Sequence, residues 1–150
     1  MSQSLSQILL HVIFSTKQRR PDITSEHQSQ LHAYLAGACR AIDAEAYRVG
    51  GTVDHVHIAC RLPRTLAVSK LLEEIKKSSS AWIKQQTGAP NDFTWQSGYG
   101  AFSIGQSQLS ALLRYIDNQK EHHCTKTFQE EYLEFLRRYN VPYKEEYLWD

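Results

Sequence analysis

The order of strand-like and helix-like segments most constrains how this chain can fold. A β-branched, apolar run at 7–16 predicts a strand, and apolar residues three to four apart over 25–41 predict a helix. Two strand-like runs flank Gly50 and Gly51. They are followed by a predicted helix within 65–88 and by a predicted aromatic, glycine-rich strand within 93–105. This strand–helix–strand–strand–helix–strand order is the split βαβ pattern of ferredoxin-like domains. We predict an α+β fold whose antiparallel sheet has helices on one face, leaving the other free for a site or partner.

Smaller features complete the predicted architecture. The adjacent glycines predict a tight hairpin turn between the second and third strands. Apolar spacing predicts a helix over 108–121 and a short C-terminal helix over 127–139, before an aromatic tail. The chain has no internal repeat, and its 150 residues are enough for one core, so we predict a single domain over 1–150.

Composition narrows the class of protein. Hydrophobic residues make up 41% and charged residues 22%, as in ordinary globular domains. No apolar run approaches the roughly 20 residues that span a bilayer, and we see no signal-peptide pattern at the start. The three cysteines are odd in number and form no CxxC pair, which indicates reduced thiols. We therefore expect a cytoplasmic protein with no membrane partner.

The stretch "VDHVHI" contains the first candidate site residues. In a strand, His55 and His57 would share one face, with Val56 and Ile58 on the other. Two imidazoles make an incomplete metal shell that needs a further ligand from elsewhere. The alternative is a pair of hydrogen-bonded core histidines. Asp54 either orients a histidine as a hydrogen-bond acceptor or caps the turn.

Tyr115 and Gln119 are the second candidate pair. They lie four residues apart on the helix predicted over 108–121, and so on one helix face. The Gln119 carbonyl can bind a hard cation, and the Tyr115 phenol can act as a covalent nucleophile. The alternatives are an exposed glutamine and a tyrosine that packs at the rim of the helix.

Together these segments resemble the small HUH-type single-tyrosine transposases of insertion sequences, the IS200-like family, and their domesticated relatives. "HVIFSTKQRRP" is similar to the family's first strand, "VDHVHI" to its histidine–hydrophobic–histidine motif, and "WQSGYGAFSIG" to its fourth-strand region. "RYIDNQ" resembles the catalytic helix, and "HHCTKTFQEEYLEFLRRYNVPYKEEYLWD" resembles the tail of one common branch. The resemblance covers nearly the whole chain and implies a ferredoxin-like fold.

The resemblance also implies a reaction. It implies a metal-dependent transposase that cleaves and rejoins single-stranded DNA through a 5′-phosphotyrosine intermediate. His55, His57 and Gln119 take the positions of ligands for Mg²⁺ or Mn²⁺, and Tyr115 takes that of the nucleophile. The implied partners are hairpin DNA ends and a second copy of the chain. In several family members the tyrosine helix of one subunit completes the histidine site of the other.

Binding residues outside this site are harder to assign. The net charge is +1, but 61–84 holds six basic residues against two acids, which permits nucleic-acid binding without requiring it. The candidate phosphate-binding cations are Lys17, Arg19, Arg20, Arg61, Lys70, Lys77, Lys84 and Arg114. A solvated helix face is the alternative for the basic segment. Trp95 and Tyr99 are expected in the core or a subunit interface rather than as platforms for bases.

Five further residues receive structural interpretations. We interpret His122, His123 and Cys124 as a helix C-terminus with favourable dipole contacts rather than a second metal cluster. His11 is predicted to be a structural histidine near the site, and Cys60 a small core residue. Three functional alternatives stay open: a domesticated, non-cutting regulator that binds hairpin nucleic acid, a replication-initiator or relaxase nickase, and a plain metal-binding domain.

Overall fold

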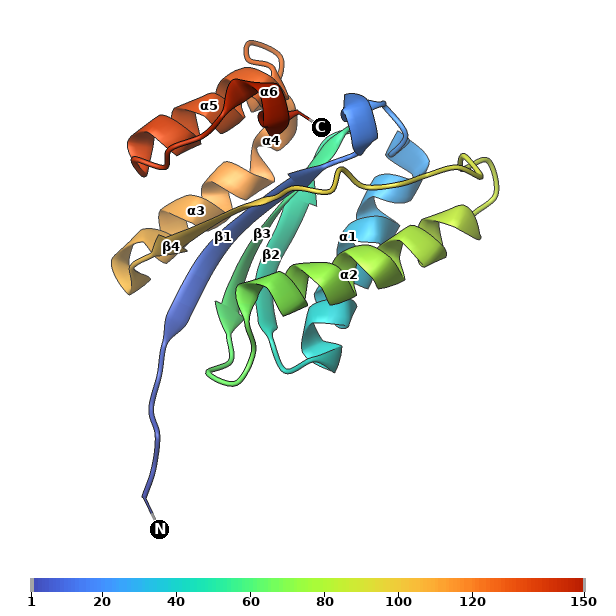
Figure 1. Ribbon diagram of the computed structural model, residues 1–150. Coiled ribbons are helices and arrows are strands. Elements are labelled where there is room, and N and C mark those ends of the chain that lie inside the picture. The colour runs from blue at the N-terminus through green and yellow to red at the C-terminus, as the bar shows by residue number, and fades with distance from the viewer. Residues whose placement is uncertain (1, 150) are drawn as a thin grey trace.

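A computed structural model describes residues 2–149 as a four-stranded antiparallel sheet with helices on both sides (Figure 1). The strand order is β2-β3-β1-β4, which with the chain order confirms the predicted ferredoxin-like α+β fold. The strands are β1 (Ile8–Ser15), β2 (Glu45–Gly51), β3 (His55–Leu62) and β4 (Gly100–Ile104). The helices are α1 (Ser25–Ala41), α2 (Val68–Lys84), α3 (Leu109–Asp117), α4 (Gln119–His122), α5 (Phe128–Arg138) and α6 (Glu145–Leu148), with 3-10 turns η1 (Lys17–Arg19) and η2 (Gln106–Gln108).

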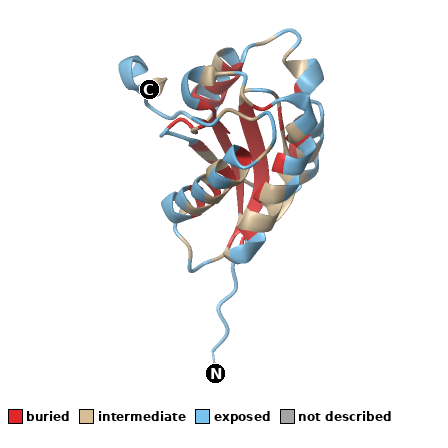
Figure 2. Ribbon diagram, turned by 90° about the vertical axis from the view of Figure 1, so that its right-hand side faces the viewer, coloured by how far each residue is buried: buried red, intermediate tan, exposed pale blue. Residues whose placement is uncertain are grey.

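The two faces of the sheet bury different sets of side chains. On one face, Leu10, Val12 and Phe14 of β1 share the main core with side chains of α1 and α2. The opposite face, predicted to be free, is covered by α3 and α5, so the central strands are buried on both sides (Figure 2). The C-terminal helices cover this face because it carries apolar residues such as Ile13 and Phe102, which need burial.

The predicted turn at Gly50 and Gly51 is wrong. Both glycines belong to β2, and the chain reverses after them, before β3 begins at His55. A Cβ on Gly50 would lie 2.7 Å from Ile116 Cγ2 and 2.8 Å from the Ile116 carbonyl oxygen. Glycine is therefore needed here because α3 packs against the β2 backbone, not because the chain turns.

The single helix predicted over 108–121 is also wrong in part. Asn118, with φ −100° and ψ 21°, separates α3 from α4. Tyr115 thus ends up on α3 and Gln119 at the start of α4. Asparagine side chains compete for backbone hydrogen bonds, so asparagine is a residue type that tolerates such a break.

The C-terminal segment packs over the site face. Thr127 caps α5 by accepting a hydrogen bond of 3.1 Å from the Glu130 backbone N–H. Phe128, Tyr132 and Phe135 of α5 form a second core cluster with Ile13 of β1. The short predicted helix is therefore confirmed within 127–139.

Other sequence expectations can be checked directly. Cys39 and Cys60 are buried free thiols and Cys124 is an exposed one, so Cys60 is the core residue predicted. Trp95 is also buried in the main core, whereas Tyr99 is 38% exposed. Over the residues that the structure describes, no helix is long and apolar enough to cross a membrane.

Candidate active site

His55 and His57 lie in the centre of the sheet, on the face covered by α3 and α5. Both side chains are fully buried. On β1, His55 pairs with Ser15 and His57 with Ile13. Directly opposite residues of an antiparallel pair share a face, so this register aims both imidazoles at the C-terminal helices.

Asp54 orients His55. The Nδ1–H of His55 donates to Asp54 Oδ1 at 2.8 Å, and the same nitrogen lies 3.0 Å from Thr52 Oγ1. In a neutral imidazole, protonation of Nδ1 leaves a lone pair on Nε2. That lone pair faces Gln119 Oε1 at 3.1 Å. Of the two interpretations of Asp54, the structure therefore favours the orienting one.

His57 is held from both sides. Its Nδ1 lies 2.8 Å from His11 Nε2, and the two rings stack with centroids 5.0 Å apart. Its Nε2 lies 3.0 Å from Glu131 Oε1. Burial lowers the pKa of His57 to about 4, although the neighbouring Glu131 carboxylate opposes the shift. His11 is thus the structural histidine that the sequence predicts.

Glu131 of α5 is the site residue that the sequence analysis missed. Its side chain is 1% exposed and contacts four histidines and Tyr115. Burial would raise the pKa of Glu131, but hydrogen bonds from His123 and His57 outweigh burial and hold it well below its usual range. The carboxylate is therefore ionised at neutral pH.

A signal for Glu131 was present in the sequence. Phe128, Glu131, Tyr132 and Phe135 recur with the three- and four-residue spacing of one helix face. A carboxylate on an otherwise aromatic, buried face must find partners, because an unpaired buried charge is costly.

The interpretation of His123 as only a helix C-terminus is wrong. Its Nε2 lies 3.1 Å from Gln119 Oε1 and 3.3 Å from Glu131 Oε1. Burial opposes protonation of His123, but the hydrogen bond to Glu131 prevails and raises its pKa. The His123 backbone N–H bonds the Gln119 carbonyl at 3.0 Å, so the two residues are one helical turn apart and their side chains share a face.

Tyr115 points into the same cluster. Its hydroxyl donates a hydrogen bond to Glu131 Oε2 and lies 3.2 Å from His122 Nε2. Its ring centroid is 5.7 Å from that of His57. Burial, followed by the interaction with Glu131, raises the pKa of Tyr115 above its ordinary value. The phenol is therefore neutral and hydrogen-bonded in this state.

The donor set fits a divalent cation. His55, His57, His123 and Glu131 each offer a ligand atom, and these atoms all lie within 4.8 Å of one another. Gln119, 1% exposed, adds its carbonyl oxygen beside them. Imidazole nitrogen with carboxylate and amide oxygen is a ligand set used by Mn²⁺ and related ions.

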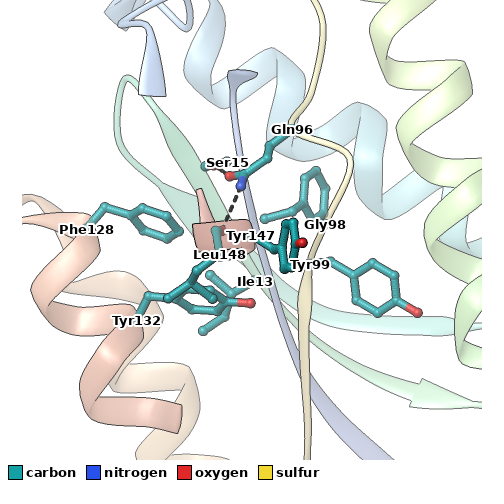
Figure 3. A pocket seen from close by; sticks show the side chains of 10 residues that line it. Ile13, Ser15, Gln96, Gly98, Tyr99, Phe128, Tyr132, Tyr147 and Leu148 are labelled. Atoms are coloured by element: carbon teal, nitrogen blue, oxygen red, sulfur yellow. Dashed lines mark hydrogen bonds between the residues drawn. The ribbon is translucent and has the colours of Figure 1, made fainter. Parts of the chain in front are cut away.

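A small aromatic cavity adjoins the histidines. Its volume is about 140 Å³, and Figure 3 shows Phe128 and Tyr132 of α5 beside Ile13 and Ser15 of β1. Gln96 bridges the cavity: it accepts a hydrogen bond of 2.7 Å from Ser15 and donates one of 2.9 Å to the Leu148 carbonyl. The same β1 residues pair with His57 and His55, so the cavity and the histidine cluster are neighbours.

The candidate phosphate-binding cations do not form one surface. Lys70, Lys77 and Lys84 lie on α2, in the layer on the other side of the sheet from the histidines (Figure 1). Three of the cations already have carboxylate partners: Asp22 and Asp92 for Arg20, Glu45 for Arg61, and Glu73 and Glu74 for Lys70.

Three further candidate cations come from two other elements. Lys17 and Arg19 lie in η1, just beyond the end of β1 that pairs with His55. Arg114 is exposed on α3, directly before Tyr115.

Comparisons with known proteins show the family of this chain. The model of the family "Transposase IS200 like" matches residues 4–119. Transposases for insertion sequence element IS200 from Salmonella typhimurium and Salmonella typhi are each 24% identical over 116 residues, covering 74% of this chain and 76% of those proteins.

Solved structures share the fold. A crystal structure described as a transposase from Deinococcus radiodurans R1 has a TM-score of 0.61 at 17% identity, covering 79% of this chain and 98% of that one. A REP-associated tyrosine transposase bound to a REP hairpin has a TM-score of 0.59 at 18% identity, covering 82% and 74%.

Fold, histidine site and family match together define a transposase. More specifically, the chain belongs to the IS200-like transposase family. The family match ends at Gln119, so α5 and Glu131 lie beyond it.

Proposed function

We propose that this transposase cleaves and rejoins single-stranded DNA through a covalent 5′-phosphotyrosine at Tyr115. One observation carries the proposal: within a single chain, the Tyr115 hydroxyl meets the cluster that contains His55 and His57. The solved relative bound to a REP hairpin supports hairpin DNA ends as the partner. We also propose that 1–150 act as one domain, as a homodimer in the cytoplasm.

We infer that His55 Nε2, His57 Nε2 and Gln119 Oε1 would hold Mg²⁺ or Mn²⁺. Such an ion supplies positive charge that polarises a phosphodiester and stabilises a departing oxygen. Asp54 and His11 support this role, because each contacts the Nδ1 atom of a histidine and so directs its Nε2 toward the site.

Tyr115 carries the covalent step. Its phenol oxygen forms a bond to phosphorus while the bond from phosphorus to the 3′ oxygen breaks, leaving the 5′ phosphate on the protein. The phenol loses its proton and the 3′ oxygen gains one. Glu131 Oε2 already accepts that phenol proton in a hydrogen bond. The phosphotyrosine conserves the bond energy, so a 3′ hydroxyl can reverse the step without ATP.

Single-stranded DNA can be bound by surfaces beside this centre. Proteins that bind single strands combine cationic groups with aromatic side chains on which bases stack. Arg114 directly precedes Tyr115 and Lys17 and Arg19 follow the end of β1 that pairs with His55, so these three are the candidate cations for the phosphates. The aromatic cavity beside His55 offers a place for a base. We propose that the other predicted cations contact the rest of a hairpin.

The test is a covalent-trapping assay. Labelled single-stranded DNA from the flanks of the gene is mixed with the protein and Mn²⁺ or Mg²⁺, then run on a denaturing gel. We expect an adduct that Tyr115→Phe, His55→Ala and a chelator each abolish, because each removes the nucleophile or the cation. Tyr143→Phe, at a tyrosine that is 42% exposed, is the matched control and should keep the adduct.

The opposite result has a definite meaning. If the protein retards hairpin DNA on a native gel but forms no adduct with either metal, the chain is a non-cutting regulator and the nucleophilic role of Tyr115 is wrong.

A further inference from the structure

The carboxylate of Glu131 lies where the ligands of the inferred cation converge. Its Oε1 atom is 3.0 Å from His57 Nε2 and 3.6 Å from His55 Nε2. We infer that Glu131 is an anionic metal ligand, supplied by a helix beyond the segment that defines the family match. This inference rests on the metal site in the proposed function and adds a ligand to it.

The charge balance supports a ligand rather than a structural ion pair. Glu131 is 1% exposed, and a desolvated carboxylate needs positive charge or several hydrogen bonds. Among the described residues, every basic nitrogen within 4 Å of it belongs to a histidine, and no lysine or arginine pairs with it. A histidine carries positive charge only when it is protonated, whereas a divalent cation would add two positive charges beside neutral imidazoles, and hard cations prefer carboxylate oxygen.

The lone pairs in the cluster point to the same conclusion. Because the Nδ1–H of His55 donates to Asp54, the Nε2 atom of His55 carries a lone pair and is an acceptor. This atom lies 3.1 Å from Gln119 Oε1, which is also an acceptor. Glu131 Oε1 is a third acceptor beside them. His123 Nε2 lies 3.1 Å from Gln119 Oε1 and 3.3 Å from Glu131 Oε1, so it can donate to only part of this set. A divalent cation would be attracted to all three acceptors at once.

The second carboxylate oxygen has a different partner. Glu131 Oε2 accepts the hydrogen bond of the Tyr115 hydroxyl, while Oε1 faces the histidines. One side chain therefore contacts both the inferred ligand set and the nucleophile. Toward Tyr115, Glu131 acts as a positioning residue that keeps the phenol beside the cation.

Mn²⁺ binding to the DNA-free, full-length protein tests the inference without relying on activity. Isothermal titration with Mn²⁺ should show Glu131→Gln binding at least about tenfold more weakly than the wild type, since a charged ligand is lost. Glu130→Gln is the matched control: it removes the neighbouring, exposed carboxylate of the same helix and should leave the affinity unchanged.

Two further variants keep the test decisive. If Glu131→Gln fails to fold by circular dichroism, Glu131→Asp, which keeps the charge but withdraws it by one methylene, should still weaken Mn²⁺ binding. Wild-type affinity in a folded Glu131 variant overturns the inference, as does a loss of affinity confined to His123→Ala.

The inference and the proposed function can fail separately. If Mn²⁺ binding depends on Glu131 but no DNA adduct forms, Glu131 is a metal ligand and the proposed phosphotyrosine mechanism is wrong. An adduct together with Mn²⁺ binding independent of Glu131 would do the reverse.

Discussion

At the scale of single residues, His32 of α1 connects burial to the pH dependence of stability. Its Nε2 is buried without a hydrogen-bond partner among the described residues, and burial, aided by Lys120, lowers its pKa to about 4. The unfolded chain takes up this proton near pH 6.5, so it binds more protons than the folded chain between about pH 6.5 and 4. The contribution of His32 to the free energy of unfolding is therefore complete above about pH 6.5. It is lost as the pH falls toward 4, by up to about 3 kcal/mol.

We expect His32→Gln to flatten that fall. Urea unfolding at a series of pH values between 7 and 4 measures it, and the free energy of unfolding should decline less steeply in the variant than in the wild type. Equal slopes would mean that His32 takes up its proton as readily in the folded state as in the unfolded one.

At the scale of elements, the packing of α3 against β2 positions the nucleophile. Gly50 lies opposite His57 in the sheet and beneath Ile116, the residue after Tyr115. Gly50→Ala would force α3 away from the sheet, so we expect a loss of about 1–3 kcal/mol in stability and a weaker DNA adduct. Thermal unfolding and covalent trapping measure the two effects.

Gly98→Ala is the control, because a Cβ there meets nothing within 4 Å. It should change stability far less than Gly50→Ala. Equal losses in the two variants would show that close packing of α3 is not the cause.

At the scale of the whole molecule, the tyrosine and the histidines of one chain already meet. Tyr115 contacts Glu131, which contacts His57, all within a single copy. We therefore expect each tyrosine to act with the histidines of its own chain. Mixing the inactive variants Tyr115→Phe and His55→Ala should then restore no adduct on the denaturing gel.

Recovered adduct in that mixture would mean that the tyrosine helix crosses to a second subunit, as in several family members. Sedimentation of the wild type alone should accompany the experiment, since the predicted homodimer is a separate question from which chain supplies the tyrosine.

Much of the framework could be read from local patterns. The spacing of apolar residues predicted α1 over 25–41, and the alternation in "VDHVHI" put both histidines on one face of β3. The break at Asn118 was not predictable in this way. Its neighbours on both sides favour a helix, so apolar spacing alone predicts one continuous helix across Asn118.

The sequence by itself determined the element order and the histidine pair on one strand face, because these follow from periodicities of two and 3.6 residues. That Tyr115 and Gln119 lie near this pair was implied by the family resemblance and not by periodicity. The tertiary structure decided that His123 and Glu131 join the pair. They lie 68 and 74 positions away from His55 and His57, respectively, and reach them only because α4 and α5 fold over the sheet. Long-range contacts of this kind depend on burying an aromatic helix face, a property of the assembled core rather than of any local segment.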